Sequence, residues 1–131
     1  MNLLDENFPG DQAQLLREWR IPFRRIGREV ARLGTKDPDI IPLLHQLRRV
    51  TFFTQDRGFG DPALCHWAYC LVWLDVRPDD AALYVRQFLK HPRFNRLNSR
   101  MGLVIRAQQD GLQFWQKNRS APQRAGWTGT K

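Results

Sequence analysis

Two apolar segments that each end in an acidic residue constrain the fold of this chain most strongly. Asn2–Leu4 runs directly into Asp5, and Val50–Thr54 is followed after one further residue by Asp56. The β-branched and aromatic residues of the second segment favour a buried strand. If both segments are strands of one parallel sheet, Asp5 and Asp56 lie at the same end of neighbouring strands. Ligands bind at that edge of open α/β sheets.

Sequence patterns typical of helix starts alternate with these two apolar segments and with further apolar segments along the chain. Proline and aspartate occur together at residues 37–39, 61–62 and 78–80, where aspartate suits the N-cap and proline suits the first helical turn. This order predicts an α/β three-layer sandwich with a mostly parallel central sheet, closed by a C-terminal β-hairpin whose turn contains Asp110 and Gly111. The expected helices span about residues 9–19, 37–49, 61–67 and 77–90, and the expected further strands span 21–26, 70–74, 101–107 and 111–116.

The length and the charge of the chain limit its organisation and its partners. We expect one domain at residues 1–117 of the 131, followed by a basic and loosely ordered tail at residues 118–131. The formal net charge of +8 is typical of proteins that bind polyanions, most often nucleic acid, although an acidic protein partner also suits it.

The chain carries no recognisable targeting segment. Its first residues lack a basic region followed by a long apolar run, so we expect no signal peptide, and no segment is long enough to cross a membrane. Cys65 and Cys70 suit a reducing compartment, and together with His66 they do not have the spacing of a zinc site. We therefore expect a cytoplasmic protein with no membrane partner.

Carboxylates gathered at one sheet edge of a basic chain require an explanation, and a bound divalent cation is the simplest one. Mg²⁺ and Mn²⁺ prefer oxygen ligands, which Asp5 and Asp56 would supply. Both residues also suit ordinary turns, and Asp37 suits a helix N-cap. The sequence shows neither a nucleophile paired with histidine nor a glycine-rich phosphate loop.

Three motifs give the chain a family resemblance. Residues 3–9 read Leu-Leu-Asp-Glu-Asn-Phe-Pro, residues 37–41 read Asp-Pro-Asp-Ile-Ile, and residues 53–60 read Phe-Thr-Gln-Asp-Arg-Gly-Phe-Gly. In this order, and over residues 2–116, the chain resembles the compact PIN-like domains that open with an LLDEN strand. PIN-like domains are metal-dependent nucleases, and many are toxins of bacterial toxin–antitoxin pairs.

The resemblance implies a metal-dependent ribonuclease that cleaves single-stranded RNA. Asp5, Asp37 and Asp56 would form a catalytic acidic triad that holds Mg²⁺ or Mn²⁺, and Glu6 would be a further ligand or lie just outside the ligand shell. Hydrogen bonds that orient these carboxylates would come from Asn7 and Thr54.

The resemblance also implies RNA contacts and protein partners. An antitoxin protein and a homodimer are the partners that it implies, and the position in the chain makes Arg24, Arg25 and Arg57 the candidates for phosphate contacts. One departure affects the metal site: family members often carry a second acid two residues after the motif aspartate, where this chain has Gly58. That difference leaves open whether one or two metal ions bind, with Asp61 as a substitute ligand.

Two other functions compete with the nuclease. A phosphoacceptor receiver domain also places acids after its first and third strands, but it needs a hydroxyl residue and a lysine after later strands, which this chain lacks. The stronger alternative is a non-catalytic PIN-like module that binds RNA or protein. In that module Trp115 and Trp127, near Arg119 and Arg124, would stack on bases.

Overall fold

The computed structural model describes residues 1–27 and 37–127, with residues 37 and 38 described only as part of their helix. Its strands are β1 (Asn2–Leu4), β2 (Arg24–Arg25), β3 (Val50–Thr54), β4 (Tyr69–Asp75), β5 (Leu103–Gln108), β6 (Gly111–Gln116) and β7 (Gln123–Ala125). Its α-helices are α1 (Gly10–Glu18), α2 (Asp37–Leu47), α3 (Ala81–Lys90) and α4 (Leu97–Arg100), and its 3₁₀ turns are η1 (Arg57–Gly60), η2 (Pro62–Leu64) and η3 (Pro78–Asp80).

The strands form one mostly parallel sheet in the order β2-β1-β3-β4-β5-β6-β7. The first five strands in this order are parallel, whereas β6 and β7 are antiparallel to their neighbours. The predicted α/β class with a mostly parallel sheet is therefore confirmed. Because parallel strands share their direction, β1, β3, β4 and β5 all end at the same edge of the sheet.

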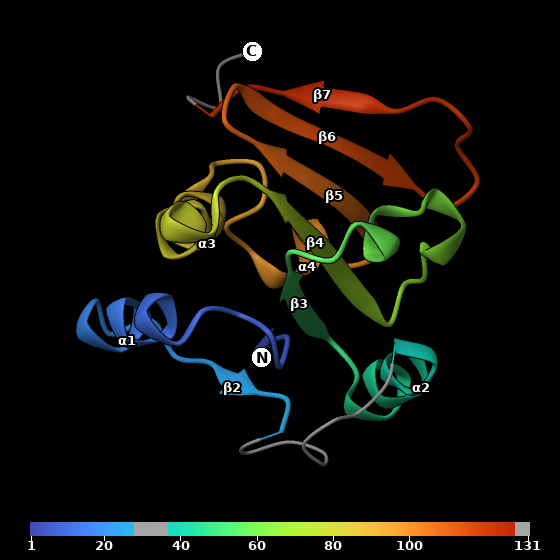
Figure 1. Ribbon diagram of the computed structural model, residues 1–131. Helices are drawn as coiled ribbons and strands as arrows, with labels where there is room; N and C mark the ends of the chain where they lie inside the picture. Colours follow the sequence, from blue (N-terminus) through green and yellow to red (C-terminus); the bar gives the residue numbers. More distant parts are fainter. Residues whose placement is uncertain (28–36, 128–131) are drawn as a thin grey trace.

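Helices cover both faces of this sheet, as Figure 1 shows for α1 and α3 on one side and α2 on the other. Neighbouring residues of a strand point to opposite faces. Leu4, Phe53, Val72 and Ile105 accordingly pack in the core under α1 and α3. The residue just before each of these points to the other face and packs in a second core, together with Ile40 and Leu44 of α2 and Phe59 of η1. These strand residues are Leu3, Phe52, Leu71 and Val104.

Three residues of the predicted tail, Gln123–Ala125, belong to the sheet. Residues 123–125 form β7, which pairs with β6, so the sheet continues beyond the hairpin of β5 and β6. The indole of Trp127 donates a 2.7 Å hydrogen bond to the carbonyl of Gln108 and fixes this end to β5. Residues 123–125 form a strand because β6 offers a free edge for backbone hydrogen bonds, a feature that their composition does not reveal.

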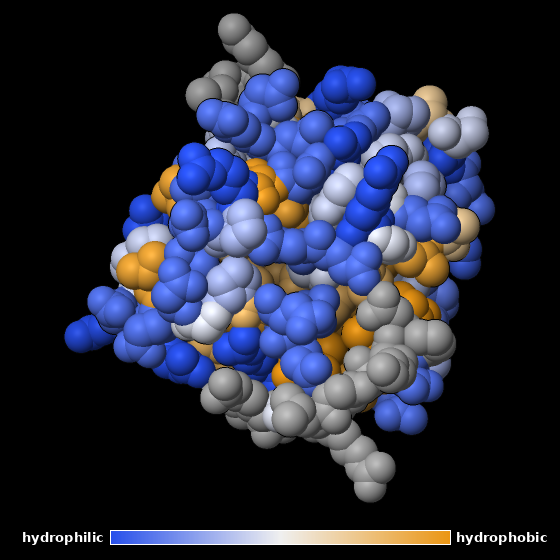
Figure 2. Space-filling model, viewed as in Figure 1, coloured by the Kyte–Doolittle hydropathy of each residue, from blue (hydrophilic) through white to orange (hydrophobic). Residues whose placement is uncertain are grey.

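Other differences are local. The expected helix over residues 61–67 is the three-residue turn η2, and α4 was not predicted, since Leu97–Arg100 carries only one large apolar residue. The face of the molecule in Figure 2 is mostly hydrophilic, and hydrophobic side chains show through in separate places. Among the described residues, no helix combines the length and the apolar character needed to span a bilayer.

Candidate functional site

Asp5 lies where β1 ends, at the carboxyl edge of the sheet. Its backbone N–H donates to the carbonyl of Phe53 at 3.0 Å, and its own carbonyl accepts from the N–H of Phe8 at 3.0 Å. The first bond continues the pairing of β1 with β3, and the second turns the chain towards α1. Its side chain is buried, with 7% of the residue exposed. The backbone thus fixes a buried carboxyl group at this strand end.

Thr54, the last residue of β3, connects the two acids that the sequence singled out. Its hydroxyl donates to Oδ2 of Asp5 at 2.7 Å, and the same Oγ1 accepts from the backbone N–H of Asp56 at 2.9 Å. The register explains this contact, because Leu4 pairs with Phe53 and so Asp5 comes next to Thr54. Thr54 is fully buried, which holds its hydroxyl in one place. The predicted role of Thr54 in orienting a carboxylate therefore has a geometric basis.

Asp56 also has a structural role, in agreement with the turn that its sequence context suits. Its Oδ1 accepts from the N–H of Gly58 at 2.8 Å and caps η1, and its carbonyl accepts from the N–H of Phe59 at 3.2 Å. These bonds bring Phe59 into the core beneath α2. The second oxygen, Oδ2, accepts no hydrogen bond from the part of the chain that the structure describes. Oδ1 of Asp56 therefore stabilises the fold, whereas Oδ2 has no hydrogen-bond donor among the described residues and could bind a ligand.

The structure brings together only part of the predicted acidic triad. Asp37 begins α2, but its side chain lies outside the described residues. Within residues 1–27 and 39–127, no group of three or more histidine, cysteine or acidic side chains is arranged to hold a metal. Asp5 and Asp56 also have no cationic partner there, because the ion pairs in that part join Arg77 to Asp79 and Arg106 to Asp75.

A third carboxylate at the same edge, Asp75 at the end of β4, was missed by the sequence reasoning. Both Nε and Nη2 of Arg106 donate to its Oδ2, at 3.0 and 2.7 Å. The guanidinium of Arg106 also lies 4.7 Å from the ring centre of Trp73. The position of Asp75 after an apolar strand was the available signal. Its pairing with Arg106 makes it a poorer metal ligand than Asp5.

The remaining predicted residues surround the site in different ways. Arg25 is buried and donates to the carbonyls of Glu6 and Phe8, so it supports the loop between β1 and α1 instead of facing solvent. Asn7 and Arg57 are exposed. Arg57 lies in η1, directly after Asp56, and is therefore the predicted phosphate contact that remains available beside the acids.

Neither cysteine is an activated nucleophile. Burial raises the pKa of the Cys65 thiol. A backbone hydrogen bond at Val104 opposes this increase in part, and the nearby carboxylate of Asp61 adds a smaller increase. Complete burial raises the pKa of Cys70 well above its ordinary range. A reactive cysteine needs a lowered pKa, so both thiols stay protonated at neutral pH. The carboxylates are the groups at this edge that offer chemistry.

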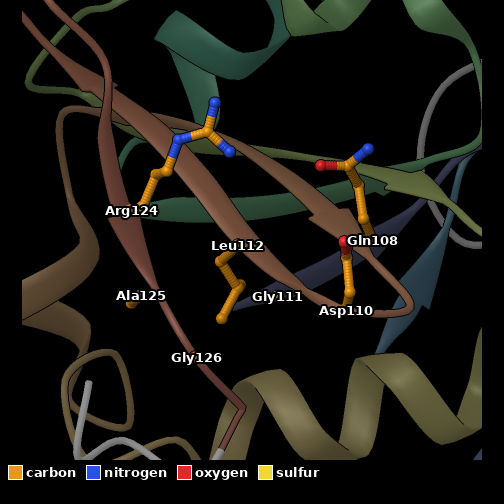
Figure 3. Close-up of a pocket in the computed structure, with 7 residues that line it drawn as sticks. All are labelled: Gln108, Asp110, Gly111, Leu112, Arg124, Ala125 and Gly126. Carbon is orange, nitrogen blue, oxygen red and sulfur yellow. The ribbon is translucent and has the colours of Figure 1, made fainter.

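A separate pocket of about 230 Å³ lies between the hairpin turn and β7. Figure 3 shows the residues that line it, which are Gln108, Asp110, Gly111, Leu112, Arg124, Ala125 and Gly126. It shares no residue with the group formed by Asp5, Thr54 and Asp56. The two acids and this pocket are therefore separate features of the molecule.

No family model, curated protein or solved structure matches this chain. A function for this chain must therefore be inferred from the residues of the site. Asp5 and Asp56 fit a hard divalent cation, since both offer oxygen ligands, both lack a cationic partner in the described ranges, and Thr54 joins them. Mg²⁺ commonly takes only one or two carboxylates and completes its shell with water and substrate phosphate.

Proposed function

We propose that this chain is a Mg²⁺- or Mn²⁺-dependent endoribonuclease of the PIN-like type that hydrolyses phosphodiester bonds of single-stranded RNA. The observation that carries the proposal is the 2.7 Å hydrogen bond from Thr54 to the buried carboxylate of Asp5. A buried charge without a cationic partner is costly, and a bound cation would compensate for it. The site also lies at the edge where open α/β sheets bind ligands.

In this reaction the described side chains would have different roles. When bound, the cation would polarise the scissile phosphate and lower the pKa of a coordinated water. Asp5 and the free oxygen of Asp56 would hold it, and Asp37 is the proposed third ligand from the start of α2. Thr54 keeps the Asp5 carboxylate in one orientation. Arg57 would contact the RNA backbone without reading the base sequence.

The basic charge of the chain supports RNA as the substrate class. With a formal net charge of +8, the protein attracts a polyanion, and this attraction does not depend on base sequence. A toxin of a toxin–antitoxin pair is the biological role that we propose for such a nuclease. Its partners would then be an antitoxin that covers the acidic edge and a second copy of the chain.

Cleavage of labelled single-stranded RNA tests the proposal directly. The full chain is incubated with Mg²⁺, with Mn²⁺ and with EDTA, beside the Asp5→Asn variant. The amide oxygen of asparagine can still accept the Thr54 hydroxyl, so this variant should fold while losing metal-dependent cleavage. Glu18→Gln is a matched control, because Glu18 is an exposed acid at the far end of α1. Equal cleavage by Asp5→Asn and wild-type protein would reject the proposal.

A non-catalytic RNA-binding or protein-binding module is the second candidate. Two observations favour it: Oδ1 of Asp56 is used to cap η1, and Asp75 is paired with Arg106. These contacts leave fewer carboxylate oxygens for a cation. Such a module should bind the labelled RNA equally well with Mg²⁺ and with EDTA and should cleave it in neither. A gel-shift assay run beside the cleavage assay separates the two functions.

A further inference from the structure

An exposed tryptophan lies at the amino edge of the sheet, opposite the carboxyl edge of the proposed metal site. Trp67 comes two residues before β4, and 67% of it is exposed. The backbone N–H of Arg49 donates to the carbonyl of Ala68 at 2.7 Å, so the loop before β4 lies against the segment that joins α2 to β3. Figure 1 shows the end of α2 and the starts of β3 and β4 close together. The indole of Trp67 is therefore in solvent near two arginines, Arg48 and Arg49.

Stacked rings hold Trp67 in place. The ring of His66 stacks on that of Trp67, with 5.1 Å between the ring centres and 27° between the planes. His66 also stacks on the buried ring of Tyr69, at 5.7 Å and 25°. The N–H of Ala68 donates to Nδ1 of His66 at 3.0 Å and fixes its orientation. One face of Trp67 therefore rests on His66, and the other face is open to a further ring.

Lys117, the residue after β6, brings a third cation to this edge. Desolvation by burial lowers the pKa of His66, and the positive charges of His45 and Lys117 nearby lower it further. His66 is therefore uncharged at neutral pH and supports Trp67 as an aromatic ring. We call this surface the basic edge, and it is formed by Arg48, Arg49, Trp67 and Lys117.

The segments that build the basic edge contain no acidic residue. These segments are residues 40–55, 62–74 and 81–109. The acid closest to Trp67 in sequence is Asp61, whose Oδ1 accepts from the N–H of Ala63 at 2.9 Å and caps η2. Among the described residues, no ion pair includes a cation of the basic edge. Its positive charge therefore attracts polyanions.

The backbone of Arg48 and Arg49 is strained. Their φ angles are 57° and 52°, in the left-handed region where glycine is the usual residue. The side chain of Arg49 donates to Oδ1 of Asn98 in α4. Arg48 is exposed, and its guanidinium has no hydrogen-bond or ionic partner among the described residues. Strained residues cluster at functional sites, and a ligand for these arginines would account for their presence here.

We propose that the basic edge binds single-stranded RNA. Arg48 and Lys117 would contact phosphates, and an unpaired base would stack on the open face of Trp67. Proteins bind single strands without sequence preference by placing basic and aromatic side chains next to each other. An acidic protein would match the charge of this edge but would leave the exposed ring without a partner. The choice of RNA rests on the proposed function, whereas binding at this edge needs neither the metal nor cleavage.

Fluorescence anisotropy of a labelled oligoadenylate, titrated with the full chain in EDTA, tests this surface. Without a divalent cation the acidic edge repels RNA, so the titration measures binding elsewhere on the protein. Trp67→Ala should weaken binding about fivefold or more, the contribution of one base stacked on an aromatic ring. Trp67→Phe keeps a ring and should lose less affinity than Trp67→Ala. Arg48→Gln should weaken binding and reduce its dependence on salt, because it removes a phosphate contact.

Arg20→Gln is the matched control for Arg48→Gln. Arg20 is also an exposed arginine in the left-handed region, with a φ of 60°, but it follows α1, on the opposite face of the sheet from α2. Its replacement should change neither the affinity for oligoadenylate nor the salt dependence. Trp67, Arg48 and Arg20 are all exposed, so the variants should fold. An equal loss of affinity in Arg20→Gln and Arg48→Gln would overturn the proposal, because it would show that only net charge matters.

Two further ligands separate base stacking from charge. Heparin is a polyanion without bases, and an RNA duplex keeps its bases enclosed, so Trp67→Ala should bind both as tightly as the wild-type protein does. Unchanged affinity of Trp67→Ala for oligoadenylate, or an equal loss for heparin, would overturn the proposal. A loss confined to polyglutamate would also overturn it and would indicate an acidic protein partner. Asp5→Asn should bind oligoadenylate like the wild-type protein, so a failure of cleavage and a failure of binding at the basic edge are distinguishable.

Discussion

The hydroxyl of Thr54 lies between two acidic residues of the sheet edge, as a donor to the Asp5 carboxylate and as an acceptor for the Asp56 N–H. It is the only described side chain that hydrogen-bonds to the carboxylate of Asp5. One buried hydroxyl therefore keeps a carboxylate in place and determines how the chain leaves β3. Changes at this residue should affect both stability and the function of the site.

Thr54→Val should destabilise the protein by about 1–3 kcal/mol, because it leaves a buried carboxylate oxygen and a backbone N–H without their partner. Thr54→Ser keeps the hydroxyl and should lose less stability than Thr54→Val. Urea denaturation with tryptophan fluorescence measures both free energies of unfolding. A double variant with Asp5→Ala should cost less than the sum of the single changes, because it removes both groups together. Additive losses would show that the two side chains do not interact.

Gly60→Ala should destabilise the protein by about 1–3 kcal/mol through overpacking. A Cβ atom at residue 60 would lie 2.5 Å from Cε3 of Trp73, a ring that is already in contact with Arg106. Gly10→Ala is the matched control, since a Cβ at residue 10 meets nothing within 4 Å and alanine favours a helix. Thermal unfolding compares the two variants. A midpoint for Gly60→Ala at or above that of Gly10→Ala would contradict this packing.

Arg106→Lys should reduce stability by at most about 1 kcal/mol, although Arg106 contacts both Asp75 and Trp73. The arginine and aspartate side chains of this pair are 34% and 37% exposed, so solvent screens their attraction. The loss should shrink as salt increases. Arg77→Lys, in a more exposed and longer pair with Asp79, should have no measurable effect. Urea denaturation at low and high salt compares the stabilities of the two variants. A loss of stability in Arg106→Lys that does not depend on salt would show that Arg106 contributes only through its contact with the Trp73 ring.

The stability of the protein should fall as the pH rises above about 9. Complete burial raises the pKa of the Cys70 thiol above its ordinary value of 9.0, so the folded protein keeps a proton that the unfolded chain has already lost. The contribution of this thiol is fully present below pH 9 and decreases above it. Chemical denaturation between pH 7 and 10 measures the slope. Cys70→Ala should flatten it more than Cys65→Ala, and an unchanged slope in Cys70→Ala would disprove the linkage.

The strands next to the site could be predicted because their sequences carry the information locally. Val50–Thr54 is β-branched and aromatic throughout, and the structure places β3 at those residues. Asn2–Leu4 was likewise predicted with the observed bounds. The strand β7 could not be predicted in this way. Gln123–Ala125 has only three residues and little apolar character, and it forms a strand because β6 offers it an edge.

The contacts within the site depend on register, which no local pattern reveals. Asp5 and Thr54 are 49 residues apart and meet because β1 pairs with β3 in one particular alignment. The prediction that Asp5 and Asp56 share one edge needed only the strand directions. Arg25 shows the opposite case, because its burial beneath the loop after β1 follows from tertiary packing, whereas its position in the chain had made it a candidate for a phosphate contact.

The position of β1 between β2 and β3 has a consequence for the order of events during synthesis. The strand that carries Asp5 is made before β3, and its partner Thr54 emerges 49 residues later. Closing such a long loop is slow compared with forming a helix. The acidic edge therefore cannot assemble until residues 2–56 have all left the ribosome. The nuclease that we propose would therefore be inactive while the nascent chain is still short.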